Sequence, residues 1–174
     1  MTGSPHAEVR PARDNDLTRI AEVERAAGRL FVDVGMPNIA EHPPTPLDVL
    51  REHLGDGTLL VATEDVGLVG FATLLELDGH AHLDQMAVHP AYGRRGHGTR
   101  LLEAACGLAR QRGHSMITLT TFQDVAWNAP YYAERGFRIL GETELTDELQ
   151  DLRTREAEFG LDPSLRVVMR RDLG

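Results

Sequence analysis

The chain has 174 residues, of which 41% are hydrophobic, and it carries a formal net charge of -9 at neutral pH. This length supports one domain with a hydrophobic core and is short for two. The acidic balance argues against a general nucleic-acid binder, and no apolar run approaches the ~20 residues that a membrane-spanning helix needs. We therefore expect a single, cytoplasmic domain over residues 1–174, with no nucleic-acid or membrane partner.

The N-terminal third of the chain predicts two helices separated by an irregular segment. After a short strand over Ala7–Arg10, Asp14 is the expected N-cap of a helix whose apolar residues recur at helical spacing through residues 17–30. Several prolines interrupt residues 31–46, a segment that either shapes a binding site or simply connects its neighbours. Residues 47–54 predict the second helix.

The centre of the chain is rich in strand patterns. Residues 58–63 and 68–77 are apolar runs joined by a short turn, which predicts an antiparallel hairpin. Asp78-Gly79 predicts a second two-residue turn, after which residues 81–88 form the third strand of a meander.

A glycine-rich loop follows this meander, then a helix that ends near Arg112 and a further strand over 115–120. A strand, a crossover helix and a strand form a parallel unit. With a last strand over 166–171, the pattern predicts an α/β fold with a mixed α+β sheet, in which an antiparallel meander precedes a βαβ unit and a C-terminal strand. Cys106 is expected in the buried stripe of the helix, and no histidine spacing indicates a metal site.

The glycine-rich loop is the most informative stretch, and it reads His89-Pro90-Ala91-Tyr92-Gly93-Arg94-Arg95-Gly96-His97-Gly98-Thr99. Gly96 and Gly98 leave the backbone N–H groups of the first helical turn accessible to a ligand. These donors, the positive end of the helix dipole and the guanidinium groups of Arg94 and Arg95 suit a pyrophosphate. The Gly-Lys-Ser/Thr ending of a P-loop is missing, and Leu101 replaces the third glycine of a dinucleotide fingerprint.

The remaining pattern resembles the acetyl-CoA loop of the GNAT N-acetyltransferase family, which reads Gln/Arg-x-x-Gly-x-Gly/Ala after a strand ending in Val-x-Pro. Val88 and Pro90 supply that strand ending. Gly93 falls where the family has glutamine or arginine, and Arg94 falls where glycine is frequent. This departure leaves the two later glycines and the charge of Arg95 in register.

A second stretch, residues 127–137, resembles the GNAT segment Ala-x-x-Phe-Tyr-x-x-x-Gly-Phe. Pro130 near its start and Gly136 after its end predict a short helix. Tyr132 takes the position of the family tyrosine, which is the general acid in many members. Asn128 is expected either to contact the cofactor or to cap the helix, of which we favour the cap.

The resemblance implies an acetyl-CoA-dependent N-acetyltransferase that passes the acetyl group directly from the thioester to an amine. Acetyl-CoA would lie where two parallel strands separate, and the backbone that would hold its pantetheine and acetyl carbonyl belongs to Met86, Ala87 and Val88. The N–H groups that would hold its pyrophosphate come from Arg94, Arg95, Gly96, His97, Gly98 and Thr99.

The resemblance also implies a proton acceptor and a proton donor. An amine with a pKa near ~10 must lose a proton before it attacks, so a base or a water chain is required. His82 and Asp84, on one face of the same strand, are the expected bases, and Glu76 is a third candidate. Tyr132 would protonate the leaving thiolate, and Tyr131 is expected to be a packing residue.

The acceptor is expected to be a primary amine of a small molecule or a peptide. Two other functions stay open: a catalytically silent sensor that binds acyl-CoA, and an enzyme that modifies proteins docked on the acidic surface. Homodimers are common among the relatives implied, so a homodimer is possible.

Overall fold

The structure is a computed structural model that describes residues 6–174, and these residues form two compact units. The first unit comprises residues up to Leu74 and Gln85–Gly107, and the second comprises Leu75–Asp84 and Leu108–Gly174. Strands β3 (Gly67–Leu77) and β4 (His80–Val88) and helix α4 (His97–Gln111) each contribute residues to both units. The expectation of a single domain stays a prediction.

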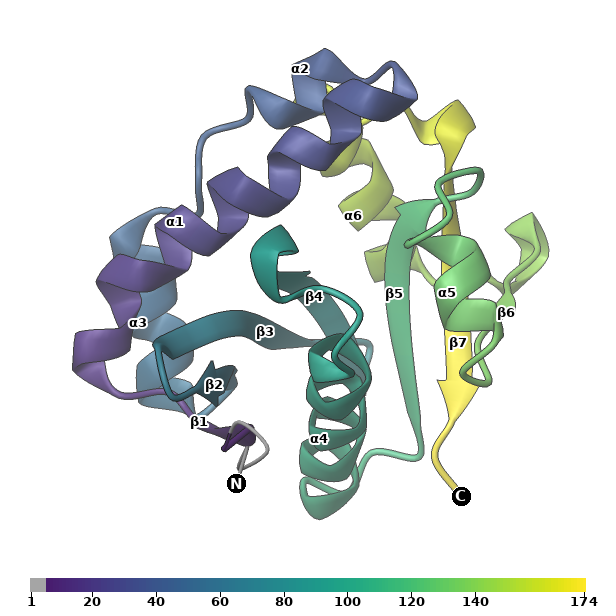
Figure 1. Cartoon of the computed structure of the whole chain (residues 1–174). Helices are drawn as coiled ribbons and strands as arrows, with labels where there is room; N and C mark the ends of the chain where they lie inside the picture. The colour runs from purple at the N-terminus through teal and green to yellow at the C-terminus, as the bar shows by residue number, and fades with distance from the viewer. Residues whose placement is uncertain (1–5) are drawn as a thin grey trace. The chain divides into compact units, whose positions relative to one another are not determined.

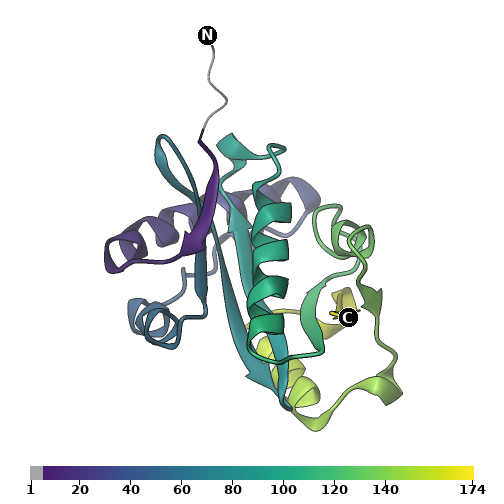
Figure 2. The same cartoon turned by 90° about the horizontal axis from the view of Figure 1, so that it is seen from below.

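The first unit is built on the antiparallel strands β1 (Glu8–Pro11), β2 (Leu59–Glu64) and β3. Helices α1 (Leu17–Gly28) and α3 (Leu47–Asp56) lie side by side in both views (Figure 1 and Figure 2). Their apolar faces form one core with the strands, whose buried members are Leu17, Ile20, Val23, Leu50, Leu59, Val61, Leu68 and Phe71. The predicted hairpin and both predicted helices are therefore confirmed.

The irregular segment between α1 and α3 contains two short helical pieces. They are the 3-10 helix η2 (Arg29–Val34) and the helix α2 (Pro37–Ala40), separated by Gly35, which has a φ of 77°. Glycine is favoured in this left-handed conformation because it has no Cβ. Residues 43–46, three of which are proline, form no regular secondary structure before α3 begins.

The second unit continues from the turn that joins β3 to β4. Asp78 and Gly79 both have positive φ, 51° and 73°, as a two-residue hairpin turn requires. β4 pairs in parallel with β5 (Met116–Phe122), and the paired register runs from Ala81 with Ile117 to Leu83 with Leu119. This parallel pairing after the crossover helix α4 confirms the predicted βαβ unit.

The remaining strands of the second unit follow β5 in the order β5-β7-β6. β7 (Arg166–Asp172) is antiparallel to β5 along seven residue pairs, and β6 (Arg138–Ile139) forms only two pairs with β7. Helices α5 (Ala129–Ala133) and α6 (Asp147–Glu158) and the 3-10 helices η4 (Glu142–Glu144) and η5 (Pro163–Leu165) complete the unit. The seven strands and the helices between them confirm the mixed α/β class.

Cys106 in α4 and the length and apolar character of the helices each bear on an expectation from the sequence. Cys106 has no exposed surface, which confirms that it is a core residue. Within residues 6–174, no helix combines the length and apolar character needed to cross a bilayer.

The prediction that Asp14 caps α1 is wrong. A 3-10 helix η1 (Asp14–Asp16) precedes α1, and the buried acid is Asp16. Its carboxylate accepts hydrogen bonds from both terminal nitrogens of Arg10, at 2.8 and 3.1 Å, and from the backbone N–H of Arg13, at 2.7 Å. Burial opposes ionisation of Asp16, but these bonds outweigh it and hold the pKa of Asp16 below its ordinary value.

We expect Asp16→Asn to lower the free energy of unfolding by about 2 kcal/mol, because a buried charge-assisted pair loses one partner. Asp14→Asn, the same change at an exposed position two residues earlier, should alter it by less than about 0.5 kcal/mol. Urea denaturation of both variants measures this. Equal losses of unfolding free energy in the two variants would contradict the assignment of Asp16 as the buried, hydrogen-bonded acid.

Candidate active site

The glycine-rich loop of the first unit ends in the first turn of helix α4. After β4, the 3-10 helix η3 (Pro90–Tyr92) leads into the loop, and α4 begins at His97. Gly96 has a φ of 83°, and its carbonyl accepts the N–H of Arg100 at 3.0 Å as the first bond of the helix. The first N–H groups of an α-helix point out of its N-terminus, which suits an anion.

Gly93 and Arg94, the two residues that depart from the family pattern, have contrasting backbone conformations. Gly93 is extended, with a φ of -65° and a ψ of 160°, which any residue adopts. Arg94 has a φ of 60°, a left-handed conformation that costs a residue with a Cβ roughly 1 kcal/mol. Position 94, where the family pattern frequently has glycine, is thus also the position at which this backbone favours glycine.

A carboxylate at the end of β2 holds the loop in position. Oε1 of Glu64 lies 2.6 Å from Nε2 of His97, and the carboxylate accepts hydrogen bonds from Arg95 at 3.0 and 3.2 Å. His97 is 2% exposed, so its ring is part of the protein interior. The bonds from His97 and Arg95 hold the pKa of Glu64 below its ordinary value, which keeps the carboxylate ionised.

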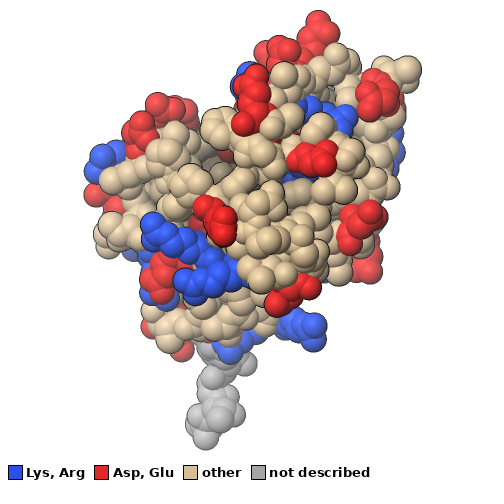
Figure 3. All heavy atoms as spheres, turned by 90° about the horizontal axis from the view of Figure 1, so that it is seen from above, with Lys and Arg blue, Asp and Glu red and all other residues tan. Residues whose placement is uncertain are grey.

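The loop arginines are ordered to different degrees. Arg95 is tied to Glu64 and lies over the ring of Tyr92 at 5.3 Å from its centroid, and Arg100 donates to the carbonyl of Arg95 at 3.1 Å. Arg94 is exposed. Figure 3 shows one group of adjoining basic side chains, with other basic and acidic side chains scattered over the same face, although the chain as a whole is acidic. Positive charge beside a helix N-terminus favours an anionic ligand.

The strand expected to hold the pantetheine is fixed closely to β3. The N–H of His89 donates to the carbonyl of Val69 at 2.8 Å. A Cβ on Gly70 would come within 2.9 Å of the carbonyl oxygen of Ala87 and 3.2 Å of the side chain of Val88, so only glycine allows this approach. Met86, Ala87 and Val88 are half-buried, and Ala87 packs against the core of the first unit.

His82, in the second unit, is deeply buried. It is 1% exposed, and its Nδ1 lies 2.8 Å from the hydroxyl of Thr118 on β5. Burial, assisted by the nearby charge of Arg166, lowers the pKa of His82 to about 4, so the ring is neutral at physiological pH. Asp84 is exposed, although it lies two residues further along the same strand.

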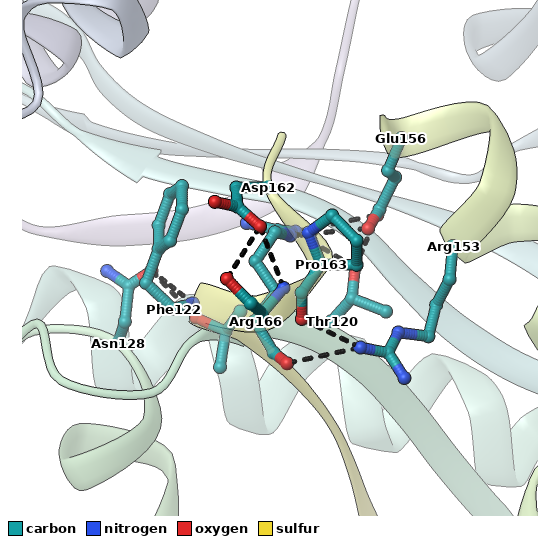
Figure 4. Close-up of polar contacts among 10 residues, drawn as sticks. Thr120, Phe122, Asn128, Arg153, Glu156, Asp162, Pro163 and Arg166 are labelled. Atoms are coloured by element: carbon teal, nitrogen blue, oxygen red, sulfur yellow. Dashed lines mark hydrogen bonds and ion pairs between the residues drawn. The ribbon is translucent and has the colours of Figure 1, made fainter. Parts of the chain in front are cut away.

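A polar network anchors β5 to α6 and β7, as Figure 4 shows. The Thr120 hydroxyl donates to Glu156 at 2.5 Å, and Arg166 donates to both, at 3.2 Å to Glu156 and 3.0 Å to Thr120. Arg153 donates to the carbonyl of Pro163 at 2.9 Å. No sequence pattern predicts this network, because nothing in the local sequence of its residues links them.

Tyr132 lies on α5, also in the second unit. It is 8% exposed, with its ring edge-to-face against Tyr131 and Phe137 at centroid distances of 5.3 and 5.7 Å. Burial raises the pKa of Tyr132 far above its ordinary value, so its hydroxyl keeps its proton. A protonated phenol is a hydrogen-bond donor at any physiological pH.

Asn128 occupies the N-cap position of α5, but its side chain does not cap the helix. Its Oδ1 accepts the hydroxyl of Thr121 at 2.7 Å and the N–H of Phe122 at 3.3 Å, as Figure 4 shows in part. Asn128 therefore fastens the end of β5 to the start of α5. The favoured interpretation as a side-chain cap is wrong, and its contact with a cofactor stays a prediction.

Comparison with known proteins places this architecture among acetyltransferases. The structure is similar to N-acetylglutamate synthase from Neisseria gonorrhoeae in complex with coenzyme A and N-acetyl-glutamate, with a TM-score of 0.70 and 22% identity over 99% of this chain and 36% of that chain. It is also similar to the ribosomal-protein-S18-alanine N-acetyltransferase of Escherichia coli, with a TM-score of 0.66 and 17% identity over 97% and 94% of the two chains. These likenesses show the fold.

The model of the Acetyltransferase (GNAT) family matches residues 18–137, and the chain belongs to this family. A curated acetyltransferase from Stachybotrys chartarum is 35% identical over 72 residues, which are 41% of this chain and 30% of that protein. The chain thus spans less than a third of the length of the curated relative that it matches. Family membership confirms the resemblance carried by the glycine loop and the Tyr132 segment.

We expect Glu64→Gln to weaken acetyl-CoA binding on the order of tenfold, because the loop loses the anion that orders His97 and Arg95. Asp65→Asn, at the exposed neighbouring residue, should leave binding unchanged. Isothermal titration with acetyl-CoA measures both dissociation constants. Tighter binding by Glu64→Gln would show that the carboxylate repels the pyrophosphate more than it orders the loop.

His82 also makes a testable contribution to stability. Its pKa is about 4 in the folded chain and 6.5 when exposed, so the unfolded chain takes up the proton first as the pH falls. Stability is complete above pH 6.5 and is lost toward pH 4. Wild type should lose about 3 kcal/mol more than His82→Asn between pH 7 and pH 4 in urea denaturation. Equal losses of unfolding free energy in wild type and His82→Asn would contradict the assignment of His82 as a neutral, buried ring.

Proposed function

We propose that this protein transfers an acetyl group from acetyl-CoA to a primary amine of a small molecule or a peptide. The observation that carries the proposal is the glycine loop at the start of α4, where Gly96 sets the turn and Glu64 orders His97 and Arg95. Several structural neighbours were solved with coenzyme A, among them an N-acetyltransferase from Thermoplasma acidophilum. Family membership supports the same cofactor here.

In this proposal, acetyl-CoA contacts both the loop and the strand before it. The N–H groups from Arg94 to Thr99 bind the pyrophosphate, with the helix dipole adding to the attraction. Backbone groups of Met86 and Val88 bind the pantetheine and the acetyl carbonyl. Both residues lie beyond Leu83, the last residue of β4 that pairs with β5.

The reaction needs one proton acceptor and one proton donor. The ammonium loses one proton to give the free amine, whose nitrogen forms a bond to the acetyl carbon and releases a second proton as the amide forms, while the carbon–sulfur bond breaks to release the thiolate of coenzyme A; the second proton replaces the one that the thiolate takes up. Tyr132 protonates or hydrogen-bonds this thiolate through its hydroxyl, which its raised pKa keeps protonated until the thiolate forms. The amine proton passes to His82 or Asp84 through water, His82 being available as a neutral imidazole.

The test measures thiol release from acetyl-CoA with a panel of amines, amino acids, polyamines and peptides. We expect Tyr132→Phe to lower kcat about 10²-fold with acetyl-CoA binding unchanged, because phenylalanine keeps the ring but removes the donor. Tyr131→Phe, the same change at the neighbouring residue, should retain the wild-type rate.

Each alternative outcome has a separate meaning. Equal rates for Tyr132→Phe and wild type would exclude the tyrosine as the acid. Tight acetyl-CoA binding without turnover of any amine would instead favour a sensor that binds the cofactor and transfers nothing.

A further inference from the structure

The ring of His82 makes its one hydrogen-bond contact within residues 6–174 with the hydroxyl of Thr118. The parallel pairing of β4 with β5 places the two residues opposite each other in the register, and Nδ1 of His82 lies 2.8 Å from that hydroxyl. Both side chains belong to the second unit and are buried, at 1% and 3% exposure. Solvent therefore competes little for the bond between them.

The surroundings of His82 oppose a second proton on the ring. Burial removes the water that would stabilise an imidazolium, and the charge of Arg166 on β7 adds repulsion, so that the pKa of His82 falls to about 4. Arg166 is held in place by Glu156 and Thr120, to which it donates hydrogen bonds. At neutral pH the ring is thus an imidazole with one N–H and one lone pair.

The two tautomers of this imidazole use the contact with Thr118 differently. If Nδ1 carries the proton, it donates to the hydroxyl oxygen, and the hydroxyl proton is left without an acceptor, because Thr118 makes no second side-chain hydrogen bond within the described residues. If Nε2 carries the proton, the hydroxyl donates to Nδ1, and both buried groups are satisfied. A buried hydroxyl that donates to nothing is unfavourable, so the contact favours the tautomer with its N–H at Nε2.

We propose that Thr118 fixes His82 as the Nε2–H tautomer, so that the ring acts as a hydrogen-bond donor and Asp84 accepts the amine proton. The inference rests on the proposed acetyl transfer and decides between its two candidate acceptors. A neutral imidazole takes up a proton only at the nitrogen that bears the lone pair, which is Nδ1 here, and the Thr118 hydroxyl already occupies it. Asp84 is exposed, so water can reach its carboxylate. Thr118 is therefore a positioning residue for the reaction.

One water completes the proton transfer. Nε2–H of His82 donates to the oxygen of this water, the ammonium passes one proton to it, and the water passes one of its own protons to Asp84, so that water and His82 end unchanged. Residues two apart on a strand are separated by about 6.6 Å, close to the ~5.6 Å of two successive hydrogen bonds. Water can reach Nε2, because the buried side-chain atom that lacks a partner in the described residues is the hydroxyl of Thr73, and not this nitrogen.

Nitrogen-15 NMR of the histidine rings measures the tautomer directly and needs no turnover. We expect wild type at pH 7 to carry the His82 proton on Nε2 in about nine-tenths of the molecules or more, with the signals assigned by their loss in His82→Asn. Thr118→Val removes the donor and should shift the Nδ1 signal, whereas Thr118→Ser, the matched control that keeps the hydroxyl, should not. A proton on Nδ1 in wild type, or an unshifted Nδ1 signal in Thr118→Val, would overturn the proposal whether or not any amine is acetylated.

Thiol release with the amine found by the panel tests which residue accepts the proton. We expect Asp84→Asn to lower kcat about 10²-fold, and His82→Gln, whose amide keeps an N–H donor but takes up no proton, to lower it less than about tenfold. Asp78→Asn, the same change at an exposed acid in the turn before β4, should keep the wild-type rate. A loss in His82→Gln as large as that in Asp84→Asn would overturn the proposal, make His82 the acceptor and leave acetyl transfer standing.

Discussion

The contact between the Glu64 carboxylate and the buried His97 ring fixes where α4 begins. Glu64 ends β2, and His97 opens the helix, so one short contact of 2.6 Å joins the hairpin to the first helical turn. The direction of the N–H groups in that turn depends on the orientation of the helix start. Glu64 also binds Arg95, and both Arg94 and Arg95 are exposed. The loop is therefore ordered by an anion of the chain before any phosphate binds.

Most of the remaining candidate site residues lie on strand β4. Because side chains alternate along a strand, these residues are divided between its two faces. His82, Asp84 and Met86 share one face, and Leu83, Gln85 and Ala87 share the other. Ala87 packs against the core of the first unit, and Gln85, two residues earlier, lines a cavity together with Glu24 of α1. A shift of one residue in the strand would exchange the two sets completely.

The fold was predictable because its signals are local. The turn at Asp78-Gly79, the hairpin before it and the helix after the glycine loop follow from short patterns that each meet one physical requirement. The candidate site was predictable only where its residues are close together in the sequence, as in the glycine-rich loop. Contacts such as Glu64 with His97, 33 residues apart, have no sequence pattern. The sequence pattern favoured Asp14 as the cap, whereas the buried carboxylate that Arg10 binds belongs to Asp16.

In the loop, glycine and arginine stand in the reverse of the order that is common in the family. Tertiary geometry, and not a local sequence pattern, accounts for this order as well. Arg94 bears the left-handed backbone and Gly93 the extended one, the reverse of what conformational preference alone would select. A Cβ at Gly93 would lie 3.2 Å from the carbonyl oxygen of Pro90, a close contact that glycine avoids. The cost at Arg94 is roughly 1 kcal/mol, similar to what one ordered ion pair contributes. The loop can therefore keep an exposed arginine in a strained conformation, where its charge is available to an anionic ligand.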